Sequence, residues 1–401
     1  MARTRYRRLR RLGGLTAVSC TAVLSAMTLP AHAAPEGRIS GAGEPGSVSG
    51  SYLVTLKGGT RAASTAGKSL AEKYGARISH TYGTVLNGYA VGADERQARR
   101  LAADPRVASV VQDTRVTLER TQKNPPSWGL DRLDQPRLPL DRSFTGPRSA
   151  GAGSTVYVID TGIRISHRDF GGRASYGWDF VGNDRSAGDG NGHGTHVAAT
   201  AVGAGYGVAK QAKVVAVRVL DNAGSGTITQ VIAGIDWVTR NARKPAVANL
   251  SLGGRHNDQL DAAVRNSIAS GVTYAVAAGN VGQPAALHSP ADVPQAITVG
   301  ATDAKDARAS FSNYGPAVDL FAPGVAITSA GITGDTARAT YSGTSMAAPH
   351  AAGAAALYLA DHPRATPAQV GRALVNLAAS GKVSWRGPGS PDKLLQTPGS
   401  Q

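Results

Sequence analysis

Cysteine is almost absent from this 401-residue chain, since Cys20 is the only one. A disulfide within the chain is therefore excluded. Aromatic residues make up only 5% and charged residues 17%, but 41% are hydrophobic, so the chain can build a sizeable core and is not a disordered polyelectrolyte. After Glu119 there is no glutamate, which removes the acidic base that a helical zinc-hydrolase motif needs.

Positive charge is in excess, with a formal net charge of +16. In residues 121–401 the basic side chains are scattered rather than clustered, and few aromatic side chains are available to stack on bases. Both features argue against nucleic acid as a partner. A solvated, mildly basic surface explains the charge.

The first 33 residues have the composition of an export signal. Six arginines precede an apolar run from Leu12 to Leu29, and Pro30 and the triplet Ala31-His-Ala33 follow it. This order predicts a signal peptide over residues 1–33 that is cut after Ala33. A retained membrane helix would need ~20 apolar residues before any breaker. We therefore expect a secreted, extracellular protein with no membrane attachment and, once Cys20 has left with the signal, no thiol.

A small domain follows the signal. Residues 34–50 are rich in Gly, Ser and Pro and are expected to be a linker. Residues 51–118 predict a compact α+β domain. Its elements are a strand (52–56), a helix (63–74), a hairpin through Asn87-Gly88, a helix (94–103) and a strand (107–111). Residues 114–132 are polar and aperiodic, so we expect an exposed connector that proteases can cut.

A larger domain occupies residues 119–397, before a short tail at 398–401. Apolar, β-branched runs alternate with helical patterns, which is typical of the α/β class with a parallel sheet covered by helices on both faces. The predicted strands are 155–160, 214–220, 246–252, 272–278 and 296–299, and the predicted helices are 195–201, 229–241, 258–270, 345–360 and 366–379. Ligands of such sheets bind at the carboxyl ends of the strands.

Two polar motifs follow predicted strands. Asp160 ends the first strand in an Asp-Thr-Gly sequence. Aspartic proteases share that tripeptide, but their chemistry needs two carboxylates that share a proton, and no second copy exists here. An ordinary turn carboxylate is the alternative. His193 is flanked by two glycines, which let the backbone place its ring at a helix start and facing a cleft. His196 is better explained as a buried core histidine.

The third motif contains Ser345, which opens an alanine-rich helix. Its own N–H and the positive helix end would face any oxyanion that it forms. Pro349 follows about four residues later, where we expect its missing N–H to be one of those a helix leaves unpaired anyway. An ordinary N-cap serine is the alternative. Because Ala347 replaces the last glycine of a G-x-S-x-G elbow, an α/β-hydrolase esterase or lipase is disfavoured.

In the order Asp, His, Ser, the three motifs favour nucleophilic catalysis. A serine hydroxyl becomes a good nucleophile only when a neutral imidazole accepts its proton. That imidazole in turn needs a buried carboxylate to fix its tautomer and to stabilise the imidazolium.

Residues from about 120 to 397 resemble a subtilisin-like serine protease (subtilase) of the proteinase-K-like branch. The resemblance rests on five blocks in family order: Val158-Ile-Asp-Thr-Gly162, Gly192-His-Gly-Thr-His-Val197, Asn249-Leu-Ser-Leu-Gly253, Ala277-Ala-Gly-Asn280 and Gly343-Thr-Ser-Met-Ala347. The segment from 51 to about 118 resembles the propeptide of such enzymes, a small ferredoxin-like α+β domain. A peptide-binding pseudo-enzyme would share the fold, but such proteins usually lose a triad member.

The resemblance implies a secreted serine endopeptidase of broad specificity that acts through an acyl-enzyme. Asp160, His193 and Ser345 would be the catalytic triad, and Asn280 would donate to the oxyanion. Polypeptide substrates would bind between two chain edges beside a pocket lined by small residues. The implied substrate-binding residues are Gly224, Ser225, Gly226, Ser251, Leu252, Gly253, Ala278 and Gly279.

The resemblance also implies a self-processed zymogen. The propeptide would act as an intramolecular chaperone and inhibitor and would be cut off near residues 115–125. No cofactor is expected for catalysis, and the enzyme is expected to be a monomer. The carbonyls of Pro294 and Ala296 and the carboxylate of Asp319 match a calcium site of the proteinase K relatives. With one carboxylate, a structural Ca²⁺ there would need water and backbone oxygens as further ligands.

Overall fold

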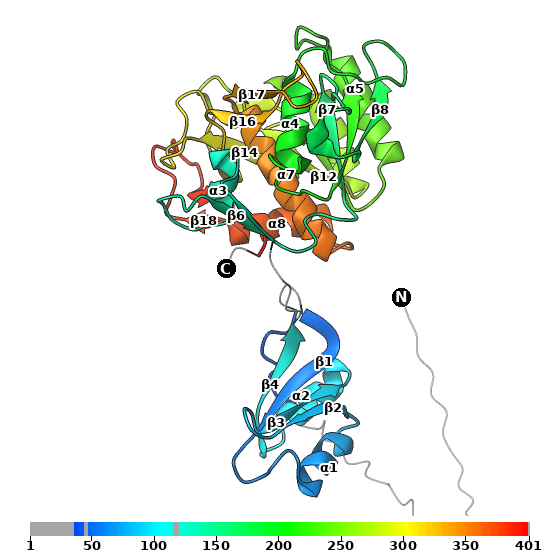
Figure 1. The fold of residues 1–401 in the computed structure, drawn as a ribbon, viewed down its shortest axis with the longest axis vertical. Coiled ribbons are helices and arrows are strands. Elements are labelled where there is room, and N and C mark those ends of the chain that lie inside the picture. Colours follow the sequence, from blue (N-terminus) through cyan, green and yellow to red (C-terminus); the bar gives the residue numbers. More distant parts are fainter. Residues whose placement is uncertain (1–35, 44–46, 115–119, 400–401) are drawn as a thin grey trace, which may run out of the picture. The chain divides into compact units, whose positions relative to one another are not determined.

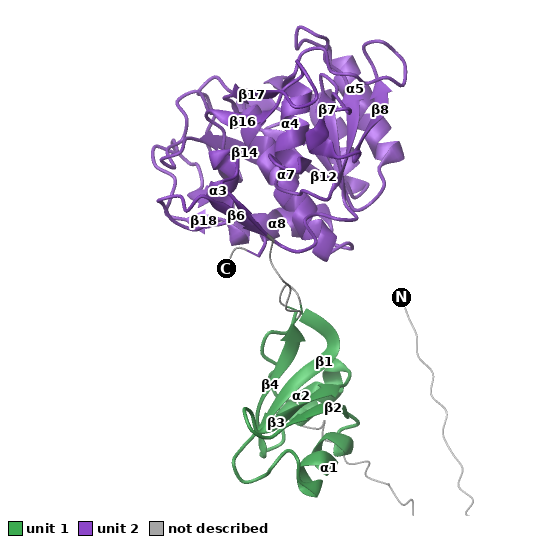
Figure 2. Ribbon diagram, in the orientation of Figure 1, with its two compact units in different colours: residues 1–115 green, residues 116–401 purple. Residues whose placement is uncertain are grey.

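The structure is a computed structural model that describes residues 36–43, 47–114 and 120–399. The chain divides into two compact units, Met1–Arg115 and Val116–Gln401 (Figures 1 and 2). The expected signal peptide, with Cys20, lies outside the described residues, as do residues 115–119 of the expected maturation region. Among the described helices, none combines the length and the apolar composition that crossing a bilayer requires.

The first unit is a four-stranded antiparallel sheet with two helices. Its elements are β1 (Ser47–Leu56), α1 (Thr65–Lys73), β2 (Arg77–Tyr82), β3 (Gly88–Gly92), α2 (Glu95–Ala102) and β4 (Val107–Thr114). The strand order is β2-β3-β1-β4. This βαββαβ connectivity confirms the expected ferredoxin-like domain.

The N-terminal boundary of this unit differs from the prediction. Strand β1 begins at Ser47, inside the expected linker. Ile39 is only 6% exposed and belongs to the core of the unit. The backbone N–H of Ser40 donates to the carbonyl of Val110 at 3.0 Å. The chain is held here because an apolar side chain and free backbone groups find partners on the edge strand β4, which composition alone did not reveal.

The second unit is built on a nine-stranded sheet in the order β18-β19-β15-β14-β12-β10-β7-β9-β8 (Figure 1). All neighbours are parallel except β18 and β19. The strands of this sheet are β7 (Thr155–Asp160), β8 (Ala174–Asp179), β9 (Lys213–Arg218), β10 (Ala246–Leu250), β12 (Thr273–Ala277), β14 (Ile297–Thr302), β15 (Leu320–Pro323), β18 (Ala379–Ser380) and β19 (Lys393–Leu394).

Helices cover both faces of this sheet, as predicted. They are α4 (His193–Val202), α5 (Ile228–Asn241), α6 (Asp258–Ala269), α7 (Thr344–Asp361) and α8 (Pro367–Leu377). Strand β7 shows how the faces divide: Val156 and Val158 pack in one core with α4, α7 and α8, whereas Tyr157 and Ile159 pack in a second core with α5 and α6. Alternate side chains of a strand point to opposite faces, and here both faces are buried.

Shorter elements complete the unit. They are β5 (Arg120–Lys123), α3 (Trp128–Leu133), β6 (Ser143–Gly146), a 3₁₀ turn (Arg168–Phe170), β11 (Gly254–Arg255), a 3₁₀ turn (Ala285–Leu287), β13 (His288–Ser289), β16 (Ile327–Ala330) and β17 (Arg338–Tyr341). Strands β11 and β13 form an antiparallel pair, as do β16 and β17.

The expectation of an exposed connector over residues 114–132 is wrong at its C-terminal end, since residues 121–126 are mostly exposed but residues 127–132 are mostly buried. Strand β5 pairs with β6, and helix α3 buries Leu130 and Leu133 completely. Arg132, also fully buried, forms an ion pair with Asp306 at 2.7 Å. These partners lie far along the chain, so a local reading of polar residues could not identify them.

Candidate active site

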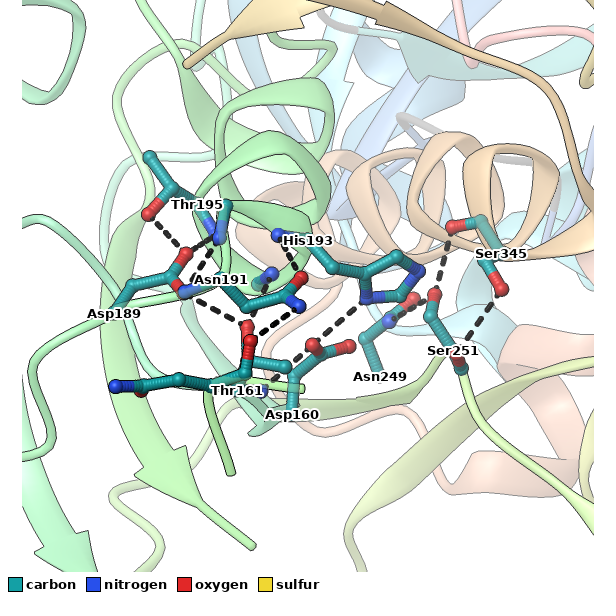
Figure 3. Close-up of polar contacts among 12 residues, drawn as sticks. Asp160, Thr161, Asp189, Asn191, His193, Thr195, Asn249, Ser251 and Ser345 are labelled. Carbon is teal, nitrogen blue, oxygen red and sulfur yellow. Dashed lines mark hydrogen bonds and ion pairs between the residues drawn. The ribbon is translucent and has the colours of Figure 1, made fainter. Parts of the chain in front are cut away.

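Asp160 is the last residue of β7 and is fully buried. Its Oδ1 accepts a hydrogen bond from the backbone N–H of Thr161 at 2.7 Å and lies 2.8 Å from Nδ1 of His193 (Figure 3). The second carboxylate oxygen, Oδ2, is buried and has no hydrogen-bond partner among the described residues. The carboxylate therefore faces one imidazole and can hold its Nδ1–H in place.

His193 is the first residue of α4, and its ring position depends on glycine. Gly192 precedes the helix with φ 107°, a backbone conformation that favours glycine. A β-carbon on Gly194 would lie 2.2 Å from the carbonyl oxygen of Gly162, so the chain can approach β7 only without a side chain there. The two flanking glycines thus have the role expected from the sequence.

A second carboxylate, Asp189, fixes the loop before His193. It accepts hydrogen bonds from the backbone N–H of Gly192 at 2.8 Å and from the hydroxyl of Thr161 at 2.9 Å. The Thr161 hydroxyl oxygen accepts from the N–H of Gly194 at 2.9 Å. Sequence reasoning assigned no role to Thr161, which lies inside the first quoted block, or to Asp189, which precedes the second. They tie the end of β7 to the start of α4 and so set the distance between Asp160 and His193.

The pKa of His193 is raised above its ordinary value. Burial of the ring alone lowers it, but the charge and the hydrogen bond of Asp160, aided by the charge of Asp189, outweigh burial. The carboxylate of Asp160 thus stabilises the imidazolium that forms when His193 accepts a proton. His196, in contrast, is fully buried, and burial lowers its pKa to about 4, which agrees with a core histidine.

Ser345 is the second residue of α7. Its Oγ donates a hydrogen bond to the carbonyl of Ser251 at 3.0 Å. Figure 3 shows the ring of His193 between Asp160 and Ser345 in this view, and both His193 and Ser345 line the same cleft. A hydrogen bond between a serine nucleophile and its imidazole base often forms only when substrate is bound.

Pro349 has a different consequence from the one expected. It is the sixth residue of α7, beyond the first turn, so its missing N–H leaves the carbonyl of Ser345 without the usual i+4 donor. The hydroxyl of Ser251 fills this position and donates to the Ser345 carbonyl at 2.8 Å, while Nδ2 of Asn249 donates to the Ser251 oxygen at 2.8 Å. The end of β10 thus holds the backbone of Ser345 in place (Figure 3).

Asn280 lies close to the backbone N–H of Ser345. Its Oδ1 accepts hydrogen bonds from the N–H of Thr344 at 2.7 Å and from the Thr344 hydroxyl at 2.8 Å. This leaves the Nδ2 donors of Asn280 facing away from Thr344. A β-carbon built on Gly343 would lie 3.5 Å from Nδ2 of Asn280 and 3.6 Å from the N of Ser345. The two donors therefore converge on the space that Gly343 leaves open, a geometry suited to an oxyanion.

The cleft that contains these groups has a volume of about 930 Å³. All eight residues expected to bind substrate line it, namely Gly224, Ser225, Gly226, Ser251, Leu252, Gly253, Ala278 and Gly279. Arg255, Val281 and His288, which sequence reasoning did not name, also line it. In the described part of the chain no Asp or Glu belongs to this lining.

The surroundings of Asp319 suit the calcium site that was expected there. Oδ2 of Asp319 accepts a hydrogen bond from the N–H of Thr298 at 2.8 Å, which places the carboxylate beside the start of β14, next to Pro294 and Ala296 in the chain. Burial raises the pKa of Asp319 to about 6. No Lys or Arg among the described residues forms an ion pair with it. A half-buried carboxylate without a counter-charge fits a hard cation such as Ca²⁺.

A parallel α/β sheet with a carboxylate, an imidazole and a serine hydroxyl at the carboxyl ends of its strands is typical of serine hydrolases. Comparison with known proteins gives the family: residues 151–396 match the subtilase family and residues 51–119 match peptidase inhibitor I9. The chain belongs to the subtilase family of serine proteases and carries an inhibitor I9 domain at its N-terminal side.

Similar proteins agree with this assignment. The chain is 53% identical over 324 residues to the extracellular serine proteinase of Thermus sp., covering 81% of this chain and 78% of the relative. It is 41% identical over 393 residues to the cuticle-degrading serine protease of Arthrobotrys oligospora, covering 92% and 96%. The crystal structure of a cold adapted subtilisin-like serine proteinase superposes with a TM-score of 0.66 at 52% identity, covering 67% of this chain and 97% of that one.

Proposed function

We propose that this serine protease is a secreted endopeptidase that cleaves polypeptides through an acyl-enzyme on Ser345. The observation that carries the proposal is the convergence on one cleft of the Asp160–His193 pair, at 2.8 Å, and the start of α7 with Ser345. His193 takes the proton of Ser345 as Oγ attacks the scissile carbonyl and then gives it to the leaving amine. Asp160 stabilises the imidazolium.

The charge on the tetrahedral intermediate is stabilised by two N–H donors. The backbone N–H of Ser345 and Nδ2 of Asn280 supply them, beside Gly343. The Asn249–Ser251 contacts keep the first of these donors in position, because they hold the backbone of α7 where Pro349 removes a helical bond.

Substrate binding rests on the two edges of the cleft, 224–226 and 251–253, which can pair with an extended peptide through backbone hydrogen bonds. Because backbone hydrogen bonds do not involve the side chains of the peptide, we expect broad specificity. Ala278 and Gly279 leave room for a large apolar side chain. With Arg255 and no carboxylate in the described lining, the cleft disfavours basic side chains next to the cleaved bond.

The I9 domain supports synthesis as a zymogen. We place its removal before Arg120, because β5 is part of the sheet pairing of the catalytic unit through β6 and would remain with it. Before that cut the domain serves as chaperone and inhibitor, which suits a parallel sheet whose distant pairings make folding slow. Mass measurement of the active secreted protein tests this: retention of residues 51–110 would contradict it.

Calcium bound by Pro294, Ala296 and Asp319 would have a structural role, with no part in the chemistry. The same proposal includes a monomeric mature enzyme, which a sedimentation measurement can check. Secretion follows from the export signal over residues 1–33.

A casein digest with matched variants tests the activity. Ser345→Ala should abolish cleavage, whereas Ser186→Ala, at an exposed position outside the cleft, should cleave as the parent does. An esterase would hydrolyse small esters without digesting casein, and a peptide-binding pseudo-enzyme would do neither. Equal digestion by the parent and Ser345→Ala would exclude the proposed nucleophile.

A further inference from the structure

A cluster of one histidine and three aspartates lies outside the triad. His256 occupies the loop between β11 and α6, Asp258 and Asp261 lie in the first turns of α6, and Asp292 follows β13. Nδ1 of His256 lies 2.6 Å from Oδ2 of Asp292 and 3.5 Å from Oδ2 of Asp261. One ligand atom from each of His256, Asp261 and Asp292 falls within 4.8 Å of the others.

Two buried carboxylate oxygens of this cluster have no hydrogen-bond partner within residues 36–43, 47–114 and 120–399. The side chain of Asp261 is 3% exposed and points at His256, yet its Oδ1 has no hydrogen-bond partner. Oδ1 of Asp292 is also buried and unpartnered. No Lys or Arg among the described residues pairs with these carboxylates. Burying such charges without compensation is costly, so a bound cation would stabilise the cluster.

The second ring nitrogen of His256, Nε2, also has a carboxylate partner. Nε2 lies 3.1 Å from Oδ1 of Asp258, which is 83% exposed. Without an ion both ring nitrogens face carboxylates, so the Nδ1 proton, which lies between Nδ1 and Oδ2 of Asp292, must leave before Nδ1 can bind a metal, and the Asp258 contact keeps the other proton on Nε2. Metal-binding histidines commonly have this arrangement, in which an outer carboxylate orients the ring.

The spacing suits a small tetrahedral ion. Bonds of ~2.0–2.1 Å to nitrogen and oxygen place two ligands of a tetrahedron ~3.3 Å apart. The observed separations of 2.6 and 3.5 Å from Nδ1 lie on either side of that value. An imidazole with two carboxylates is a donor set for Zn²⁺ and similar ions, whereas Ca²⁺ prefers six or more oxygen ligands. His256, 54% exposed, leaves a path to solvent for entry and for a water ligand.

The backbone holds the cluster in place without any ion. Strands β11 and β13 pair Gly254 with Ser289 and Arg255 with His288. The N–H of Asn257 donates to the hydroxyl of Ser289 at 2.7 Å. The ligands therefore come from two segments that are already joined, so that binding a cation would order few additional groups.

We propose that His256, Asp261 and Asp292, with Asp258 orienting the imidazole, bind one divalent transition-metal cation of the zinc type. The ion links the segment of β11 to the segment of β13. Both strands line the substrate cleft, through Gly254, Arg255, His288 and Ser289. The bound ion thus stabilises one wall of the substrate cleft. Its binding does not depend on the catalytic proposal.

Zinc uptake by the full chain tests the site. The Ser345→Ala protein, which cannot digest itself under the proposed mechanism, is dialysed against Zn²⁺ in excess Ca²⁺ and its metal content is measured. We expect one more equivalent in this parent than in its His256→Gln derivative, and a Co²⁺-loaded parent with the absorption of a tetrahedral site that the derivative lacks. Asp258→Asn should bind 10–100-fold more weakly, the usual effect of losing an outer carboxylate.

His288→Gln is the matched control, since this neighbouring histidine on β13 lies outside the cluster. It should bind zinc as the parent does. Asp261→Asn removes a buried ligand, so its thermal midpoint is compared with and without zinc: the parent should gain thermal stability from the ion and this variant should not. Equal zinc content in the parent and His256→Gln, or loss of the ion in His288→Gln alone, would overturn the proposal. So would complete displacement of zinc by the excess Ca²⁺.

Discussion

Replacing Asn280 separates its structural role from its proposed oxyanion role, because the amide oxygen and the amide nitrogen of its side chain face different groups. Oδ1 accepts from the N–H and the hydroxyl of Thr344 at 2.7 and 2.8 Å, whereas Nδ2 faces the space beside Gly343. Asn280→Asp keeps oxygens for Thr344 and removes the donor. A carboxylate at the start of α7 is also compatible with the helix dipole, so the variant should fold.

The expected effect follows from the number of donors. The site offers two, Nδ2 of Asn280 and the N–H of Ser345, and loss of one such donor typically costs ~2.7–4 kcal/mol of transition-state stabilisation. We therefore expect kcat to fall ~100- to 1,000-fold in Asn280→Ala, with little change in KM. Asn280→Asp should lose at least as much, since its charge repels the oxyanion.

The assay is steady-state hydrolysis of a peptide substrate, with thermal unfolding measured on the same preparations. Asn280→Asp with a near-parental melting temperature and a large loss of kcat would support the oxyanion role. A kcat within about threefold of the parent in both variants, or a loss confined to KM, would refute it, since a donor used only in the transition state acts on kcat.

Three further predictions concern pH and stability. Because His193 must be neutral to act as base and its pKa is raised, kcat/KM should fall about tenfold per pH unit below that raised pKa; a pH–rate profile that is flat down to pH 4 would contradict this. Asp306→Asn tolerates the local φ of 63° but leaves buried Arg132 unpaired, so urea unfolding should show a loss of ~3–5 kcal/mol, and a change under ~1 kcal/mol would argue against the ion pair. Burial lowers the pKa of His350 to about 4 from 6.5, so the unfolded chain binds the proton first and stability should decline by on the order of 3 kcal/mol as pH falls from 6.5 to 4. Urea titrations of the parent across that range should show this decline and those of His350→Gln a smaller one; equal slopes would contradict it.

Local sequence predicted the groups that carry the proposed chemistry. Asp160 ends a strand whose every residue is buried, and His193 follows Gly192, whose backbone conformation favours glycine. Such signals are readable because strand period, turn chemistry and helix start act over a few residues. The α/β sheet and the α+β class of the small domain were predictable for the same reason, whereas the ferredoxin-like topology was implied by the family resemblance.

Contacts between distant segments were not predictable. The role of Pro349 depends on Ser251, almost a hundred residues earlier, lying beside the carbonyl of Ser345. The buried place of Arg132 depends on Asp306. The His256 cluster needs Asp292, which approaches only because β11 pairs with β13. In each case tertiary packing decides the environment of a residue whose neighbours in sequence give no indication of it.

The most direct test of the account is covalent labelling of the nucleophile. A fluorophosphonate reacts with a serine only when an adjacent base and an oxyanion site activate it. Peptide mapping by mass spectrometry should locate one label, on Ser345, in the processed protein and none in His193→Ala. A label on another serine, or an unlabelled Ser345 in a preparation that still digests casein, would contradict the central claim.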